Sequence, residues 1–194
     1  MKKVLACLLA VLMVAAFSVT AFAANPSVEQ ETTVQATTDS GEEVDVTVTP
    51  VASAEDVKKD KTLSADQKTA AVSALETAEA AVEAAESGDS TMIEQIAATV
   101  GTTDEEVAAL KKELLTATNG QDAKLGGAQV IKTDAANSTV AFDNVPVNFL
   151  GVWFFPLDGG KPVFLKLSKD GTITYPGAGL AYNVYAQEEE APAV

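Results

Sequence analysis

The sequence predicts an α+β protein with an N-terminal β-hairpin, an Ala-rich helical segment and a C-terminal antiparallel β-sandwich-like module. Three observations support this prediction. Valines alternate with polar residues at 44–49, which is typical of a half-buried strand. An Ala-rich stretch with helix-capping patterns fills residues 51–120. Short apolar runs separated by turn residues fill 121–187, a spacing typical of a sandwich or a barrel-like sheet.

Residues 1–23 resemble a signal peptide. Lys2 and Lys3 precede an apolar run that is too short to span a bilayer as a helix. Ala21-Phe22-Ala23 offers small residues at both positions that signal peptidase recognises, so we expect cleavage after Ala23 and secretion. The only cysteine, Cys7, lies inside this segment and too close to the lysines to be a lipoprotein cysteine. Cleavage removes two lysines and no acid, so the net charge changes from −15 to −17.

Residues 24–50 are predicted to form the hairpin. Val44, Val46 and Val48 would face a core, and Pro50 would end this strand. Asp39-Ser40-Gly41 has turn chemistry, and residues 32–37 form the partner strand.

The helical segment, 51–120, is predicted to contain three helices. Each begins at a Ser or Thr that is followed three residues later by Gln or Glu, the capping-box pattern: Ser64 with Gln67, Thr91 with Glu94, and Thr103 with Glu106. We expect the first helix to end at Gly88, the second before Gly101 and the third near Thr118.

The C-terminal module, 121–187, is predicted to contain six strands, at about 128–132, 138–143, 148–155, 162–168, 172–175 and 180–186. If the hairpin joins the same sheet, the helical segment is an insertion between two of its strands. Residues 188–194 are predicted to be an acidic, disordered tail.

Composition excludes several kinds of chemistry. The chain has no His, and all 13 of its basic residues are Lys. Ser–His–Asp catalysis, His-ligated metals and bidentate Arg clamps are therefore excluded, and cleavage removes the one thiol. A strongly acidic surface repels nucleic acid. We expect no cofactor, no metal, no nucleic-acid partner, no membrane span in the mature chain, and no catalysis.

Two groups of carboxylates are candidates for a cation site. Glu76, Glu79, Glu83 and Glu86 form an acidic stripe on the first helix, which we interpret as a solvated face rather than a calcium or cationic-partner surface. The aspartates of the later turns do not match a calcium-loop pattern. A hydrolase that works with two carboxylates is a further alternative, because such a pair needs only a shared cleft.

The aromatic stretch 149–155 carries the candidate ligand patch. In a regular strand Phe149, Trp153 and Phe155 point to one face, and Leu150, Val152 and Phe154 point to the other. We expect a central strand that the helical segment or a loop covers. The alternative is an exposed platform of Phe149, Trp153 and Phe155 that binds a carbohydrate, a peptide or a partner.

Three stretches carry a resemblance to other proteins. They are the opening Met1-Lys2-Lys3-Val4-Leu5-Ala6, the stretch Asn25-Pro26-Ser27-Val28, and the strand 44–50, which precedes an Ala/Asp/Lys-rich segment. They resemble uncharacterised small exported proteins of anaerobic Gram-positive, clostridial-type bacteria, which pair a helical segment with a β-rich C-terminal module. The resemblance implies export and this layout, and no site residue. Together these observations predict a secreted, acidic, non-catalytic extracellular or cell-envelope interaction protein, with an unknown protein or glycan as partner. The alternative is a carbohydrate- or peptide-binding module that uses the aromatic strand.

Overall fold

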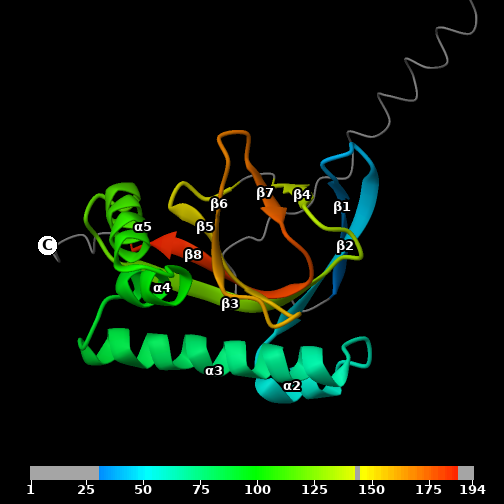
Figure 1. Ribbon diagram of the computed structural model, residues 1–194, viewed down its shortest axis with the longest axis horizontal. Coiled ribbons are helices and arrows are strands. Elements are labelled where there is room, and N and C mark those ends of the chain that lie inside the picture. Colours follow the sequence, from blue (N-terminus) through cyan, green and yellow to red (C-terminus); the bar gives the residue numbers. More distant parts are fainter. Residues whose placement is uncertain (1–30, 143–144, 188–194) are drawn as a thin grey trace, which may run out of the picture.

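The computed structural model describes residues 31–142 and 145–187. The predicted signal peptide, 1–23, and the predicted acidic tail, 188–194, lie outside these described residues. Strands come first, helices follow, and the remaining strands complete the chain (Figure 1). This order confirms the predicted α+β class.

All the strands belong to one antiparallel sheet of eight, in the order β6-β5-β8-β3-β2-β1-β4-β7. In chain order they are β1 (Thr32–Thr37), β2 (Glu43–Val51), β3 (Ala123–Lys132), β4 (Ser138–Ala141), β5 (Phe149–Pro156), β6 (Val163–Lys166), β7 (Thr172–Tyr175) and β8 (Gly179–Ala186). The sheet curls until its edge strands β6 and β7 lie near each other, without a ladder between them in the described chain (Figure 1). The sandwich-like module is therefore a nearly closed barrel that includes the N-terminal hairpin.

The helices separate two strands that are neighbours in the sheet. β2 pairs with β3 from Thr47↔Lys132 to Val51↔Ala128, and the helices of the described residues all lie between these two strands in the sequence. They are α2 (Ala54–Lys59), α3 (Ala65–Ser87), α4 (Met92–Val100) and α5 (Asp104–Ala117).

The three predicted helices are confirmed, and so are their starts. Ser64 and Thr91 each form a complete capping box, and the Thr103 hydroxyl accepts a hydrogen bond from the Glu106 backbone N–H. Gly88 ends α3 in the left-handed conformation, as expected for a glycine after a helix. The short helix α2 was not predicted.

The sheet separates two hydrophobic cores. The inner core lies inside the barrel and contains Val34, Ala36, Val46, Val48, Ile131, Val140, Phe142, Phe149, Val152, Phe154, Ile173, Tyr175, Ala181 and Tyr185. The outer core lies between the sheet and the helices. Its largest strand residues are Val130, Trp153, Phe155, Leu180, Tyr182 and Val184, and its helix residues include Val57, Ala71, Ala74, Leu75, Ala78, Ile93, Ile96 and Leu114.

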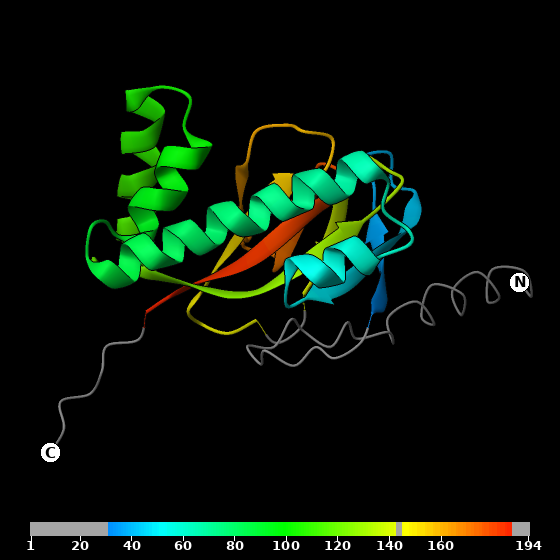
Figure 2. The ribbon, with the colours of Figure 1, turned by 90° about the horizontal axis from the view of Figure 1, so that it is seen from below.

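Helix α3 covers the outer face of the sheet. It runs obliquely across β8 and β3 (Figure 2) and contacts β3, β5 and β8. Its buried positions are Ala71, Ala74, Leu75, Ala78 and Ala81, so mostly small residues face the sheet. Small side chains let the helix approach closely, and large strand residues fill the space between.

Polar contacts attach the helical layer to the sheet, and two sets of them lie at the two ends of β3. The Asp122 carboxylate, just before β3, accepts hydrogen bonds from the backbone N–H groups of Met92 (2.9 Å) and Ile93 (3.0 Å) in the first turn of α4. The Lys132 ammonium on β3 donates to Thr62 Oγ1 (2.8 Å) and lies 3.4 Å from Asp60. Burial alone would raise the pKa of Asp60, but hydrogen bonds from Thr62 and the charge of Lys132 outweigh it and lower that pKa.

Among the described helices, none combines the length and the apolarity that a bilayer crossing requires.

Candidate binding groove

The aromatic strand β5 is an interior strand, hydrogen-bonded to β6 on one side and β8 on the other. Trp153 is 0% exposed, Phe155 6% and Phe149 8%. The expectation of a covered central strand is confirmed, and the helical segment provides the cover. The predicted alternative required these three residues to form an exposed platform, and the structure shows all three side chains buried instead.

The three aromatic residues also do not share a face. Trp153 and Phe155 lie in the outer core, whereas Phe149 lies in the inner core. Phe149 pairs with Tyr185 and Gly151 pairs with Val184, so Leu150 is an extra residue, a β-bulge. The bulge reverses the alternation of side chains between Phe149 and the rest of the strand.

Gly151 makes this bulge possible. Its φ is +150°, and a Cβ atom there would lie 2.3 Å from the carbonyl oxygen of Leu165 on β6. No residue with a side chain fits this approach of β5 to β6.

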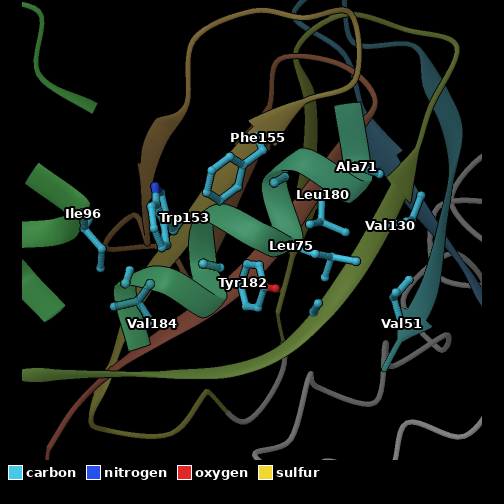
Figure 3. Packing of buried hydrophobic residues seen from close by; sticks show 14 of the residues in the cluster. Val51, Ala71, Leu75, Ile96, Val130, Trp153, Phe155, Leu180, Tyr182 and Val184 are labelled. Atoms are coloured by element: carbon cyan, nitrogen blue, oxygen red, sulfur yellow. The ribbon is translucent and has the colours of Figure 1, made fainter. Parts of the chain in front are cut away.

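Trp153 is held in a cluster of rings under the helices. Its ring centroid lies 4.7 Å from that of Phe155 and 6.4 Å from that of Tyr182. Figure 3 shows these rings between β5, β8 and α3, with Ile96 of α4 beside Trp153. Within the described chain the indole Nε1 has no hydrogen-bond partner. Trp153 is fully enclosed by this packing, so its ring is not accessible to a ligand.

A spacious concave surface lies elsewhere, at the N-terminal half of α3. We call it the turn groove. It encloses about 840 Å³ between α3, the β5–β6 turn and the β7–β8 turn. Its lining consists of Ser64, Asp66, Gln67, Thr69, Ala70 and Ser73 from the helix and its cap, Phe154, Pro156, Leu157, Asp158, Gly159 and Gly160 from the first turn, and Pro176, Gly177 and Ala178 from the second.

Backbone contacts fix the two turns that form one wall. The Leu157 N–H donates to the Ala178 carbonyl (3.0 Å), which ties the turns together. The Asp158 carboxylate accepts a hydrogen bond from the Gly160 N–H (3.0 Å). Gly159 has a φ of +83°, a conformation that favours glycine.

Phe154 forms the apolar floor of the turn groove and also belongs to the inner core. Its ring lies against the backbone of Gly179, where a Cβ atom would come within 2.0 Å of the ring.

The polar lining of the turn groove is neutral or acidic. Asp66 and Asp158 are both exposed, and no described lysine lines the cavity. Ser64 and Gln67 are engaged in the capping box, whereas Ser73 is exposed, and no described residue hydrogen-bonds to its hydroxyl group. The turn groove can accept hydrogen bonds from hydroxyl and amide groups, and it disfavours anions.

Over 31–142 and 145–187, no three His, Cys, Asp or Glu side chains come together to hold a metal ion. The buried tyrosine nearest the floor, Tyr175, has its ring centroid 5.8 Å from that of Phe154, and burial raises the pKa of its hydroxyl. A neutral phenol of this kind is not a base at physiological pH.

Sequence patterns predicted the segments that form the turn groove, but they did not predict that these segments lie side by side in the fold. The turns at 158–160 and 176–179 and the helix start at Ser64 were all predicted. They meet because β5 and β8 pair and α3 crosses them, and no local pattern records that.

No protein-family model, curated protein or solved structure matches this chain.

Proposed function

We propose that this is an exported, non-catalytic binding protein of the extracellular space or the cell envelope, and that the turn groove holds its ligand. The turn groove is the observation that carries this proposal. Its volume suits a ligand of a few sugar or amino-acid units. The predicted signal peptide and the net charge of −15 are consistent with secretion.

The ligand that fits best is an uncharged glycan segment. Exposed carboxylates accept hydrogen bonds from sugar hydroxyls, and exposed hydroxyl groups both donate to them and accept from them. Pro156 and Pro176 offer apolar surface for the C–H groups of a sugar. Anionic polymers are disfavoured because the lining has two carboxylates and no cation among the described residues. A short peptide with hydroxyl or amide side chains is the alternative occupant.

Binding to an array of microbial and plant glycans tests this proposal, with a peptide library as a second arm. Ser73→Trp fills the turn groove from an exposed position of α3, and we expect it to abolish binding. Ala109→Trp places the same ring on the exposed face of α5, outside the turn groove, and should leave binding intact. Unchanged binding by Ser73→Trp, or no binding to either array, would overturn the proposal.

A carboxylate hydrolase is the second candidate, because Asp66 and Asp158 line the same cleft. Its weakness is exposure: a general acid needs burial to raise its pKa toward neutrality, and both side chains are open to solvent. Incubating the best array ligand with the protein distinguishes the two functions. A binding protein returns the ligand intact, whereas a hydrolase releases fragments, and Asp66→Asn or Asp158→Asn stops their release.

A further inference from the structure

A second, smaller groove lies at the other half of α3. We call it the acidic groove. It encloses about 360 Å³ and is lined by Ala78, Glu79, Val82, Glu83 and Glu86 of α3, Leu125 and Gly126 of β3, and Tyr182 of β8.

A β-bulge in β3 shapes the acidic groove. Leu125 pairs with Val184 and Ala128 with Tyr182, so Gly126 and Gly127 lie opposite Asn183 alone. The two glycines at the bulge have no side chain that could fill the space beside the helix. The gap remains open between α3 and the sheet.

The rim of the acidic groove carries uncompensated negative charge. Glu79, Glu83 and Glu86 are exposed. Within the described chain none of them forms an ion pair with a lysine. They lie at spacings of four and three residues, so they line one side of the helix.

Tyr182 supplies the second, independent observation. Its side chain is only 8% exposed, and its hydroxyl group has no hydrogen-bond partner among the described residues, although it lines the acidic groove. In Figure 3 the Tyr182 oxygen lies on the side of the ring away from Trp153. The hydroxyl oxygen is open to the acidic groove rather than sealed in the core, so a ligand in the groove that supplies a donor can hydrogen-bond to it. Burial, and then the negative charge of Glu79, raises the pKa of Tyr182, so the hydroxyl stays neutral.

We propose that the acidic groove binds a primary alkylammonium group, carried either by a free polyamine or by a lysine side chain. An ammonium group has three N–H donors and no acceptor, which suits carboxylates at the rim and a hydroxyl oxygen at the floor. The methylene chain lies along Ala78, Val82 and Leu125. This site is separate from the turn groove and does not depend on its ligand.

Isothermal titration calorimetry tests the proposal with two probes, putrescine and Nα-acetyl-lysine methylamide, at physiological ionic strength. Tetramethylammonium, which has the charge but no N–H donor, is the ligand control. Saturable binding of either probe, with none of tetramethylammonium, is expected, and the probe that binds more tightly identifies the source of the ammonium group.

Variants separate a site from diffuse attraction of cations to an acidic protein. Tyr182→Phe removes only the hydroxyl and should weaken binding about tenfold. Glu79→Gln and Glu83→Gln should each weaken it about threefold to tenfold. Glu76→Gln makes the same charge change on the same helix outside the groove lining, and should change binding less than about twofold. Absence of saturable binding, or an equal effect of Glu76→Gln and Glu83→Gln with none of Tyr182→Phe, would overturn the proposal.

Discussion

The inner and outer cores are built from the same strands but by different means. The inner core is made by the sheet alone, with Val, Ile, Phe and Tyr side chains converging inside the barrel. The outer core joins large strand residues, such as Trp153 and Tyr182, to helices whose buried residues are largely alanines. Where the helix side is small, the strand side is large, so the total volume is filled.

This difference explains two types of strand sequence. In β2, Val44, Val46 and Val48 pack in or against the inner core, while Asp45, Thr47 and Thr49 alternate with them and are exposed or half-buried. In β5 and β8 both faces are buried, so apolar residues run almost without interruption. Alternation therefore marks a strand with one buried face, and continuous apolar sequence marks strands that are buried on both faces.

The largest effect is expected from breaking the outer core. Trp153→Ala removes the biggest fully buried side chain and leaves a cavity under α3, so it should lower the free energy of unfolding by about 3 to 5 kcal/mol. Urea denaturation followed by far-UV circular dichroism measures this loss.

A second substitution keeps that test informative if Trp153→Ala does not fold. Trp153→Phe retains an aromatic ring and removes the indole N–H that has no partner among the described residues. It should cost less than half as much as the alanine variant. An equal loss of unfolding free energy in both variants would show that the contribution of Trp153 to stability does not come from packing of its ring.

The inner core can be broken by adding one atom. Gly179→Ala places a Cβ atom about 2.0 Å from the Phe154 ring, and that ring is fully buried and cannot move aside. We expect a loss of about 1 to 3 kcal/mol in the same denaturation measurement.

Gly177→Ala is the matched control for Gly179→Ala, because a Cβ atom there meets no atom within 4 Å. It should change stability by less than about 0.5 kcal/mol. If Gly177→Ala and Gly179→Ala are equally stable, the Phe154 ring does not pack against the Gly179 backbone as described here.

Detaching the helical layer should have a smaller effect. Asp122→Ala removes the acceptor for the Met92 and Ile93 N–H groups and should cost about 1 to 2 kcal/mol. In the Asp122→Ala variant, native-state hydrogen exchange should be faster for the backbone amides of α4 than for those of β8. Asp104→Ala, an exposed acid at the start of α5, changes the charge equally and should change neither measurement appreciably.

The smallest effect concerns the contact of Asp60 with Lys132. Because the pKa of Asp60 is lowered in the folded protein, its ionised form stabilises the fold at neutral pH. Asp60→Asn should therefore cost about 1 kcal/mol at pH 7. The difference should shrink as the pH falls below about 4, the pKa of an Asp in an unfolded chain.

Denaturation at several pH values tests this dependence. Asp134→Asn is the control, because Asp134 is exposed and no described residue hydrogen-bonds to its side chain. A difference between wild type and Asp60→Asn that does not vary with pH would contradict the assigned role of Asp60.

Local patterns predicted most of the elements. Three helices follow from their caps, because a Ser or Thr with Gln or Glu three residues later satisfies backbone groups that no other local structure satisfies. Helix α2 was missed because it has only six residues and Ser53 makes no side-chain cap bond. The start of β3 was missed by five residues, because Gly126 and Gly127 interrupt the apolar pattern at the bulge.

Long-range pairing could not be predicted. The β4–β7 pair joins the rest of the sheet through β1, and this link rests on the single pairing Thr37↔Thr139. The orientation of Phe149 depends on the bulge at Leu150, which a period of two cannot reveal. Both grooves lie where α3 crosses strands that are distant in sequence. Local patterns predict the helix and the turns that line the grooves, but they do not predict how these segments are arranged in space.

The central claim is that the helical layer covers the aromatic strand, and Trp153 reports on it directly as the only tryptophan of the chain. Iodide quenching of native tryptophan fluorescence is the measurement. We expect blue-shifted emission that iodide quenches weakly, and red-shifted, strongly quenched emission after unfolding in urea. Red-shifted emission that iodide quenches strongly in the folded protein would contradict the buried outer core and would restore an exposed aromatic surface on β5.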